Sequence, residues 1–417
     1  MQTEACYITG TRECQVMTSE LPAIGASEVL MRVVSSSMCN STYKAFDLGA
    51  THKRVPDNLG EVAVMTGHEF AGIVEQVGDH YKDRYYAGQK IVIQPAMGLE
   101  SGYSPGYSYP YYGGDATYTI IPEVAIEKGC IMPYDVKYFA EASLAEPMSC
   151  IIGAFHASYH TTPFVYEHEM GIRHGGNLAL LGAAGPMGIA AVDYAIHGPF
   201  EPALIVVTDI DQVRLDRAAS LLPPSLLDGT GRRLVYLNTR DSEDAAKEIR
   251  AISGNKGFDD VMVYAAGRSL IETADRLLGT DGCLNFFAGP PDKDFSALFN
   301  FYNVHYESTH IVGTSGLSRS DMEECLAMSA AGQLNPSLMV THVGGIDAVP
   351  STLRNFPSIP GGKKLFYPHV HMPLVAIDEL RTHAAGDDRY AALADICEAK
   401  NNTWNLEAEQ YLLTHWT

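Results

Sequence analysis

The sequence predicts an α/β plus β protein with two kinds of domain: an all-β, barrel-like module and a doubly wound parallel-sheet domain. Between residues 28 and 130, short runs that alternate apolar and polar residues are broken by Gly and Pro, which is typical of a small barrel. From about residue 177, apolar strands alternate with helical patterns, which indicates a parallel sheet with crossover connections. The length of 417 residues suits two domains.

Composition and charge narrow the class of protein and its partners. Apolar residues make up 46% of the chain and charged residues 19%, which leaves ample material for a core. The net charge of −21 repels polyanions, so we expect no nucleic-acid partner. Residues 1–14 lack an apolar signal core, and the most apolar stretch, 178–196, contains Pro and Asp, so we expect neither export nor a membrane span. The eight cysteines form no CxxC pair, which favours free thiols in a cytoplasmic protein.

Each element of the β module follows from its local pattern. Four runs have the alternation of half-buried strands. Between the third and fourth runs, residues 96–114 are rich in Tyr, Gly and Pro, a composition that sustains neither a long strand nor a helix, so we expect an ordered surface loop. The four runs are EVLMRVV (28–34), EFAGIVEQVG (69–78), QKIVIQPA (89–96) and ATYTIIP (116–122).

The later part of the chain has the rhythm of strand, turn and helix. Six apolar runs are separated by helical patterns such as IAAVDYAIHG and QVRLDRAASLL, so we expect a parallel sheet. Beyond about residue 316 the chain returns to helices, a strand-like KKLFYP and a polar tail from Asp378 onward. The six runs are NLALLG (177–182), ALIVVTDI (203–210), RLVYLN (233–238), DDVMVYAAG (259–267), CLNFFAG (283–289) and HIVGTSG (310–316).

A glycine-rich turn between the first of these strands and its helix predicts a dinucleotide site. The fingerprint G-x-G-x-x-G lets backbone N–H groups approach a pyrophosphate at a helix N-terminus. Here Ala183 stands at its first position, while Gly185 and Gly188 stand where close approach and helix packing need glycine. An ordinary βαβ turn without a ligand is the alternative. The expected cofactor contacts are Gly185, Pro186, Met187 and Gly188.

The next strand strengthens this prediction. It ends at Asp209, which lies 21 residues after Gly188. A carboxylate there accepts hydrogen bonds from the adenosine ribose and repels a 2′-phosphate, so NAD is favoured over NADP. Arg214 either lies over the adenine, reaches the ribose or is a solvated helix residue.

Three short segments carry side chains suited to a metal ion. They are residues 37–41, 66–70 and 145–147, which contain Cys39, the tripeptide Gly-His-Glu and the pair Glu-Pro, respectively. A catalytic zinc takes about three N, S or O ligands and keeps one position open. Taken singly, a buried Cys, a Gly-His-Glu turn and a Glu-Pro helix start are all common without a metal. Together, Cys39, His68 and a carboxylate supply the mixed set that zinc needs.

The order of these motifs resembles that of the zinc-dependent medium-chain dehydrogenase/reductase family, in particular its sorbitol-dehydrogenase-like branch. Alcohol dehydrogenases proper carry Cys where this chain has Glu146, whereas the polyol branch carries Glu. The resemblance implies a GroES-like catalytic domain that is discontinuous around a Rossmann NAD-binding domain, with divisions at 1–155, 156–315 and 316–417, the last including a C-terminal extension. It implies zinc ligands Cys39, His68 and Glu146, with Glu69 as a further ligand or as a partner that exchanges with Glu146.

Several stretches are similar to bacterial L-sorbose-1-phosphate reductases, among them GHEFAGIVEQVG, AEPMSCIIGAFHASYH and GPMGIAAVDYAIHGP. This resemblance implies hydride transfer between NAD(H) and a ketose phosphate/hexitol phosphate pair, such as L-sorbose 1-phosphate and sorbitol 6-phosphate. The alternatives are a dehydrogenase of an unphosphorylated polyol or secondary alcohol, and a non-catalytic nicotinamide-binding protein. The family's habit implies a homodimer or homotetramer, for which we expect residues 310–316 to form the sheet edge.

The chain departs from the family pattern at two places. Many members bind a structural zinc through four closely spaced cysteines, but residues 96–114 contain none, so we expect one catalytic zinc and no structural zinc. Lys44 stands where many members carry a proton-relay histidine. We expect Ser41 to be the first proton carrier, because a hydroxyl both accepts and donates. Lys44 completes the relay, binds an anionic substrate group or is a surface lysine.

A basic run lies between two of the expected zinc ligands. His52, Lys53 and Arg54 follow Lys44 in a chain that is otherwise strongly acidic. A phosphate-bearing substrate needs such a cluster, and Arg suits bidentate phosphate contact; a solvated basic loop is the alternative. Three tyrosines of the 96–114 loop are expected to wall the cleft and offer hydroxyls to a sugar: Tyr103, Tyr107 and Tyr109.

Overall fold

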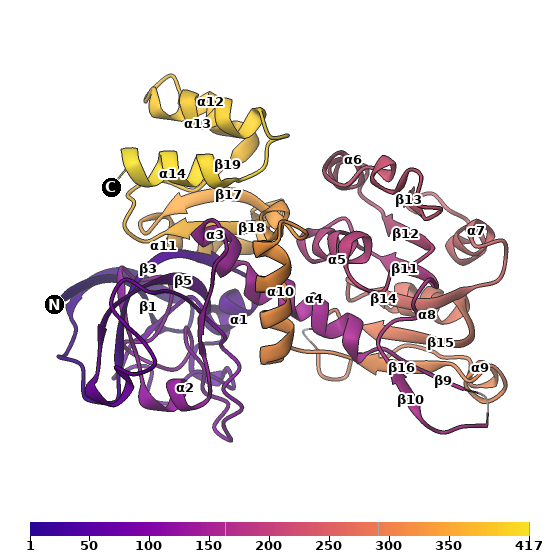
Figure 1. The fold of residues 1–417 in the computed structure, drawn as a ribbon, viewed down its shortest axis with the longest axis horizontal. Coiled ribbons are helices and arrows are strands. Elements are labelled where there is room, and N and C mark those ends of the chain that lie inside the picture. The colour runs from indigo at the N-terminus through magenta and orange to yellow at the C-terminus, as the bar shows by residue number, and fades with distance from the viewer. Residues whose placement is uncertain (163, 291, 417) are drawn as a thin grey trace. The chain divides into compact units, whose positions relative to one another are not determined.

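The computed structural model describes residues 1–162, 164–290 and 292–416, which form two compact units. The first unit consists of Met1–Pro147, Met322–Gly332 and Val340–Thr417, and the second of Met148–Asp321 and Gln333–Met339. Figure 1 labels the α-helices and many of the strands of both units. Among the described residues, no helix is long and apolar enough to cross a membrane.

The first unit is built on an eight-stranded sheet whose centre is β3 (Val29–Met38). Apolar side chains of β3 and β5, such as Val29, Val33 and Phe70, lie in one buried core. The sheet order is β19-β17-β18-β3-β5-β6-β8, with β7 paired to β3, and a three-stranded sheet has the order β2-β1-β4. The remaining strands are β1 (Gln2–Gly10), β2 (Glu13–Glu20), β4 (Val64–Met65), β5 (Glu69–Val77), β6 (Lys90–Ile93), β7 (Tyr118–Ile121), β8 (Ile131–Pro133), β17 (Val340–Gly345), β18 (Lys363–Tyr367) and β19 (Val375–Ala376).

Strand register brings distant parts of the chain to one end of this sheet. In the β3–β5 pair, Ser37 lies opposite Glu69. Cys39 follows the end of β3 and His68 precedes the start of β5, so the two residues lie at the same sheet end. In the β18–β3 pair, Lys364 lies opposite Met38, which places the start of β18 at that end as well. The register therefore gathers the site described below.

The second unit contains a six-stranded parallel sheet with the order β13-β12-β11-β14-β15-β16. The sheet interior is apolar: Ala179, Val206 and Val261 share one core with residues of α7 and α8. The strand order reverses between β11 and β14, and open sheets of this kind bind ligands at the carboxyl ends of the strands next to such a reversal. The strands are β11 (Asn177–Leu181), β12 (Leu204–Asp209), β13 (Arg233–Asn238), β14 (Phe258–Val263), β15 (Leu278–Phe286) and β16 (His310–Gly313), with a separate pair β9 (Tyr159–Thr161) and β10 (His168–Met170).

Both predicted sheet types are therefore confirmed, a β module and a doubly wound parallel sheet. The helices fill the connections that the sequence pattern indicates. They are α1 (Asn40–Leu48), α2 (Glu123–Glu127), α3 (Phe139–Ser143), α4 (Ala145–Ala157), α5 (Pro186–His197), α6 (Gln212–Leu221), α7 (Ala245–Ile252), α8 (Arg268–Leu277), α9 (Phe301–Tyr306), α10 (Arg319–Ala330) and α11 (Ala348–Asn355).

The C-terminal tail folds into helices α12 (Leu380–His383), α13 (Arg389–Glu398) and α14 (Leu406–His415), drawn in yellow in Figure 1. Glu409 of α14 is buried, and its carboxylate accepts hydrogen bonds from the backbone N–H groups of Phe139 and Ala140 at 2.7 and 2.8 Å. The tail thereby caps α3, the short helix that leads directly to Glu146.

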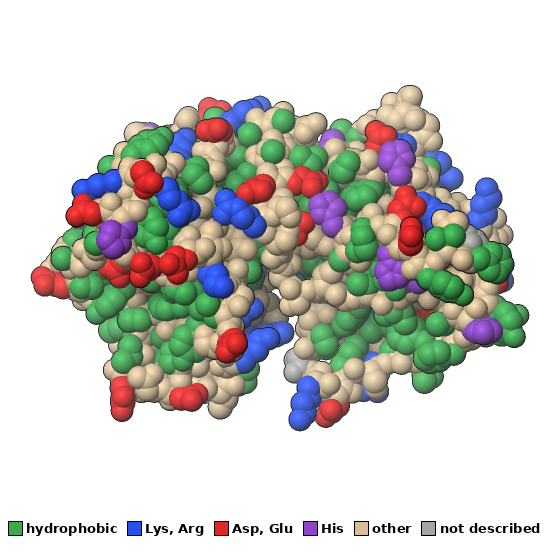
Figure 2. Space-filling model, turned by 60° about the horizontal axis from the view of Figure 1, so that its bottom comes forward, with side chains coloured by type: hydrophobic (Ala, Val, Ile, Leu, Met, Phe, Trp, Pro, Cys, Tyr) green, Lys and Arg blue, Asp and Glu red, His purple; other side chains and the backbone are tan. Residues whose placement is uncertain are grey.

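One face of the molecule carries charged side chains of both signs. On the face shown in Figure 2, acidic and basic side chains are interspersed, with apolar side chains between them. On this face no continuous basic surface is offered to a polyanion, in keeping with the net charge of −21.

Candidate active site

Three of the expected metal ligands come together in the first unit. One ligand atom each from Cys39, His68 and Glu69 lies within 4.8 Å of the others. Cys39 Sγ is 3.6 Å from His68 Nε2, and the same nitrogen is 3.9 Å from Glu69 Oε1. His68 and Glu69 are buried and Cys39 is half-buried. The group is thus compact enough for one cation to be held by all three.

Local structure explains how the thiol and the imidazole are aimed. Cys39 is the N-cap of α1, and its Sγ accepts a hydrogen bond from the Ser41 N–H at 3.2 Å, a position that favours negative charge. Gly67 turns the chain into His68 with a positive φ of 86°. On the far side of the imidazole, Thr42 Oγ1 lies 3.3 Å from His68 Nδ1, which leaves Nε2 for the ligand group.

Glu146, the fourth expected ligand, lies at the start of α4 and outside the 4.8 Å group. Its side chain is buried, and burial together with the charges of Glu69 and Cys39 raises the pKa of its carboxyl to about 8. No hydrogen bond joins this carboxyl to another described residue. A buried acid without a donor, close to a thiol and a second acid, is an environment that a cation would stabilise.

Lys363 is a site residue that the sequence reasoning did not identify. Its ammonium is 2.5 Å from Glu69 Oε1, and the Ser37 hydroxyl donates to the other Glu69 oxygen. The side chains of Lys363 and Glu69 are only 5% and 1% exposed. Burial opposes ionisation of Glu69, but the adjacent ammonium outweighs it and lowers the pKa of Glu69 below its usual value. The sequence held one signal for this residue, the pair Lys363-Lys364 at the start of the strand-like segment KKLFYP. A lysine in a buried strand needs an acidic partner, which points to a buried ion pair.

The donor set fits zinc. One thiol, one imidazole and two carboxylates are the ligand types of catalytic zinc sites, and four closely spaced thiols, which mark a structural site, are absent from the described chain near this group. Burial, and then the charge of Glu69, raises the pKa of Cys39 in the metal-free protein. A divalent cation reverses this effect, since a coordinating thiol is deprotonated. Because Glu69 is held by Lys363 and Ser37, Glu146 is the carboxylate that is free to serve as a ligand.

The expected basic cluster adjoins the ligand group through Tyr107. This tyrosine is fully buried, and its hydroxyl is 3.3 Å from His68 Nε2. The guanidinium of Arg54 lies 5.1 Å from the centre of the Tyr107 ring, and the His52 ring stacks on it at 5.8 Å. Burial, then the charges of Arg54, Lys53 and Lys44, lower the pKa of His52 to about 4. Positive potential is therefore concentrated here, despite the negative net charge of the chain.

The other residues expected in this region have fewer contacts with the metal-ligand group. The charge of Lys44 helps to lower the pKa of His52, so Lys44 belongs to the basic cluster. Among the described residues, no contact joins Lys44 to the metal-ligand group. Ser41 is exposed, and its backbone N–H rather than its hydroxyl contacts Cys39. Of the three tyrosines, Tyr107 is the one whose side chain contacts the ligand group. The rings of Tyr103 and Tyr109 instead contact each other, with 6.3 Å between their centroids.

In the second unit, the glycine-rich turn has the form that a dinucleotide needs. Gly185 is the N-cap of α5 and Pro186 is its first residue. A Cβ on Gly188 would lie 2.0 Å from the Ala183 carbonyl oxygen, so only glycine lets the helix pack there. A Cβ on Gly185 would meet nothing within 4 Å. The protein leaves open space at the helix N-terminus, where a pyrophosphate would be bound by backbone N–H groups.

Asp209 lies beside this turn at the carboxyl end of β12. Its carboxylate accepts hydrogen bonds from the N–H groups of Ala184, Ile210 and Asp211 at 3.0, 2.8 and 3.1 Å, which fixes its orientation. Arg214 lies 3.7 Å from Asp211, on the first turns of α6. Two carboxylates, those of Asp209 and Asp211, therefore lie at the end of β12.

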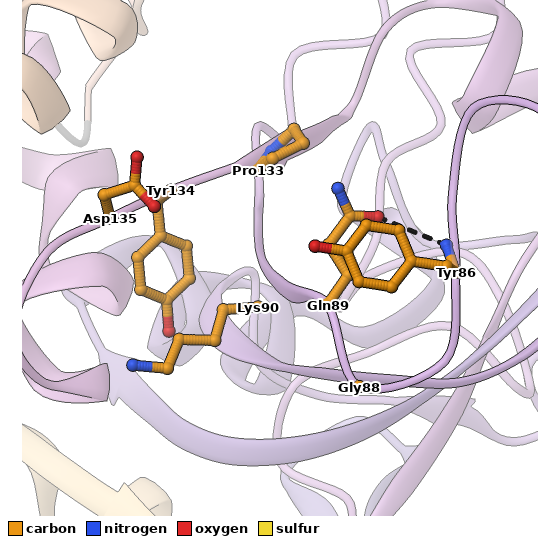
Figure 3. Close-up of a pocket in the computed structure, with 7 residues that line it drawn as sticks. All are labelled: Tyr86, Gly88, Gln89, Lys90, Pro133, Tyr134 and Asp135. Carbon is orange, nitrogen blue, oxygen red and sulfur yellow. Dashed lines mark hydrogen bonds between the residues drawn. The ribbon is translucent and has the colours of Figure 1, made fainter.

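A cavity of about 360 Å³ lies elsewhere in the first unit and contains none of these residues. Figure 3 shows Tyr86 and Gln89 on one side of it and Tyr134 and Asp135 on the other, with the side chain of Lys90 beside Tyr134. The hydrogen bond drawn there runs from the Tyr86 N–H to the Gln89 side chain. This cavity is separate from the metal-ligand group.

Comparison with known proteins agrees with both halves of this description. Residues 25–137 match the family model of the alcohol dehydrogenase GroES-like domain, and residues 186–331 match that of the zinc-binding dehydrogenase domain. The chain is 58% identical to a mannitol-1-phosphate 5-dehydrogenase of Aliivibrio fischeri, with 99% of this chain and 97% of the relative covered. It is 41% identical to an L-sorbose 1-phosphate reductase of Klebsiella pneumoniae, with 99% and 98% covered.

The fold has close counterparts among solved structures. The 2R,3R-butanediol dehydrogenase of Bacillus subtilis superposes with a TM-score of 0.72 at 17% identity, with 88% of this chain and 99% of that chain covered. With near full-length relatives at 58% and 41% identity, the chain belongs to the zinc-dependent medium-chain dehydrogenase/reductase family, in its sorbitol-dehydrogenase-like branch.

Proposed function

We propose that this oxidoreductase transfers hydride between NAD(H) and a hexitol phosphate/ketose phosphate pair, with one zinc ion at the Cys39–His68 group. The observation that carries the proposal is the basic cluster of Arg54, Lys53 and Lys44 next to the ligand group in a chain of net charge −21. Relatives at 58% and 41% identity carry the names of enzymes for phosphorylated hexitols and ketoses, which supports the same substrate class. The names of these relatives also support an enzyme over the alternative of a non-catalytic nicotinamide-binding protein.

The chain's own side chains account for binding and orientation. Cys39, His68 and Glu146 would hold the zinc, and Glu69 is kept back by Lys363. When bound, zinc supplies Lewis-acid polarisation of the reacting C–O group. Thr42 fixes the orientation of the His68 ring, so the ligand nitrogen keeps its direction through the reaction.

The substrate phosphate would be bound by the basic cluster. Arg54 offers a planar guanidinium for bidentate contact, and its position over the Tyr107 ring fixes where that contact forms. Lys53 is exposed and adds charge rather than a fixed geometry. Lys44 supports the same cluster, which favours its role in anion binding over a proton relay, and Ser41 as the first proton carrier stays a prediction.

The test compares each phosphorylated hexitol with its free counterpart. NADH formation is measured with mannitol 1-phosphate, sorbitol 6-phosphate, mannitol and sorbitol. In the double variant Lys53→Ala/Arg54→Ala, KM for the phosphorylated substrate is expected to rise about 10-fold or more, since hydrogen bonds to charged groups contribute about 1.5–3 kcal/mol each. KM for the free hexitol should not change.

The matched control is Lys82→Ala/Arg84→Ala, which removes the same two residue types from an exposed segment of the same unit. This control should leave both KM values unchanged. Equal turnover of free and phosphorylated hexitols by the wild type, with no response to Lys53→Ala/Arg54→Ala, would instead favour the dehydrogenase of an unphosphorylated polyol.

The preference for NAD is tested separately. We expect kcat/KM to be higher with NAD than with NADP, and Asp209→Asn to reduce that ratio, because the amide no longer repels the 2′-phosphate. Preference of the wild type for NADP would refute the role given to Asp209. The oligomer through β16, the edge strand of the parallel sheet, stays a prediction.

A further inference from the structure

Tyr107 occupies a place at the metal-ligand group that the family motifs do not assign. Its hydroxyl lies 3.3 Å from His68 Nε2, the nitrogen that also faces Cys39 and Glu69. The other ring nitrogen, Nδ1, is engaged by Thr42 at 3.3 Å. With the ring proton on Nδ1, the Tyr107 hydroxyl donates to Nε2, so it uses the lone pair that a metal ion requires.

The Tyr107 ring has little freedom to move away. The His52 ring stacks on it with an interplanar angle of 10°, and the Arg54 guanidinium lies over it. The preceding residue, Gly106, has a φ of 75°, and a Cβ there would lie 2.3 Å from the Gly67 carbonyl oxygen. The loop is thus packed directly against the backbone that carries His68.

Metal binding therefore changes the hydrogen bonding of this hydroxyl. Within the described chain, His68 Nε2 is its one hydrogen-bond partner, and the hydroxyl is fully buried. Once a metal takes Nε2, the hydroxyl keeps its place but loses its acceptor. A buried hydroxyl without a hydrogen-bond partner is unfavourable, so a new acceptor at that place would be strongly favoured.

We propose that Tyr107 is a catalytic residue whose hydroxyl donates a hydrogen bond to the substrate oxygen on the carbon that takes or gives the hydride. This rests on the proposed function for the identity of the substrate. A fixed donor aimed at the oxygen that gains negative charge lowers the barrier, because the charge develops in a dry site. The phenolic proton stays on Tyr107, and the hydride moves between the substrate carbon and the cofactor. The proton of the alcohol leaves to solvent, or returns from it, through the exposed Ser41, the predicted first proton carrier.

The test uses Tyr107→Phe, which removes the hydroxyl and keeps the ring. Because the phenol no longer competes for Nε2, the metal-free variant should bind Co²⁺ about 2- to 10-fold more tightly than the wild type, measured by optical titration. With the zinc-loaded enzyme, kcat should fall about 100-fold or more while KM for the hexitol phosphate changes little. Tighter metal binding together with slower turnover is a combination that loss of structure does not produce.

Tyr112→Phe is the matched control. Tyr112 lies in the same loop, is 1% exposed, and its hydroxyl has no hydrogen-bond partner among the described residues. This variant should leave both the Co²⁺ affinity and kcat unchanged. A Tyr107→Phe variant with weaker Co²⁺ binding, or with unchanged kcat, overturns the inference.

Failure of the proposed substrate has a different signature. If the wild type oxidises no hexitol phosphate, the proposed function is wrong. The Co²⁺ titration needs no substrate and still decides: without tighter binding in Tyr107→Phe, the hydroxyl does not compete at His68 and the inference falls.

Discussion

Removing the ammonium of Lys363 should destabilise the protein strongly, because its partner carboxylate cannot be rehydrated. Lys363 and Glu69 are 5% and 1% exposed, with 2.5 Å between Nζ and Oε1, so solvent screening of this pair is slight. Breaking a buried ion pair by removing one partner costs about 3–5 kcal/mol. The hydrogen bond from Ser37 remains, which places Lys363→Met toward the lower part of that range.

The assay is thermal and urea denaturation of the metal-free protein at constant pH. For a unit of this size, about 2–4 °C are lost per kcal/mol, so the midpoint should fall by roughly 6–20 °C. The control is the double variant Lys363→Met/Glu69→Gln, which removes both charges and should recover most of the loss, since replacing both partners of a buried pair is often neutral. A loss below about 1 kcal/mol in Lys363→Met, or no recovery in the double variant, would refute the reasoning.

Three further predictions follow from other parts of the structure. Gly188→Ala should lower the melting temperature, because its Cβ would lie 2.0 Å from the Ala183 carbonyl oxygen. In Gly185→Ala the added Cβ meets nothing within 4 Å, so the melting temperature should stay the same. That variant should only bind NADH more weakly, as measured by fluorescence titration. Burial and neighbouring cations lower the pKa of His52 to about 4. This pKa should rise when inorganic phosphate binds, because the added negative charge favours the imidazolium. NMR titration of the histidine signals measures the pKa, and His52→Asn assigns the signal. Burial raises the pKa of Glu409 to about 7, so the folded state binds this proton more tightly than the unfolded state does. The free energy of unfolding should therefore fall as pH rises from about 4.5 to about 7, by up to about 3 kcal/mol. Glu409→Gln should reduce that slope, measured by urea denaturation at a series of pH values. A Glu409→Gln variant with the wild-type slope, or a His52 signal insensitive to phosphate, would contradict these assignments.

The fold class could be predicted because both periodicities are local. The alternation in residues 28–130 and the strand–helix rhythm from residue 177 needed no knowledge of tertiary contacts. The motifs around Cys39, His68 and Glu69 were recognisable for the same reason, and the structure brings them within 4.8 Å. Their role as zinc ligands, and that of Glu146 outside this group, stay predictions.

What could not be predicted depends on register across long separations. Lys363 reaches Glu69 only because β18 pairs with β3 and β3 with β5, and no local pattern encodes this pairing. No pattern in the sequence indicated a role for the tail beyond Asp378. In the structure, Glu409 of this tail caps α3, the helix that leads to Glu146. Among three equivalent tyrosines in one loop, only the packing of Gly106 against the Gly67 backbone selects Tyr107.

X-ray absorption at the zinc edge, together with metal analysis of the purified protein, tests the central claim most directly. The account predicts one zinc per chain with a single sulfur ligand at about 2.3 Å and the remaining ligands nitrogen or oxygen at about 2.0–2.2 Å. Cys39→Ser should remove the sulfur signal. A zinc bound by four sulfurs, a zinc without sulfur, or a sulfur signal that survives Cys39→Ser would contradict the account.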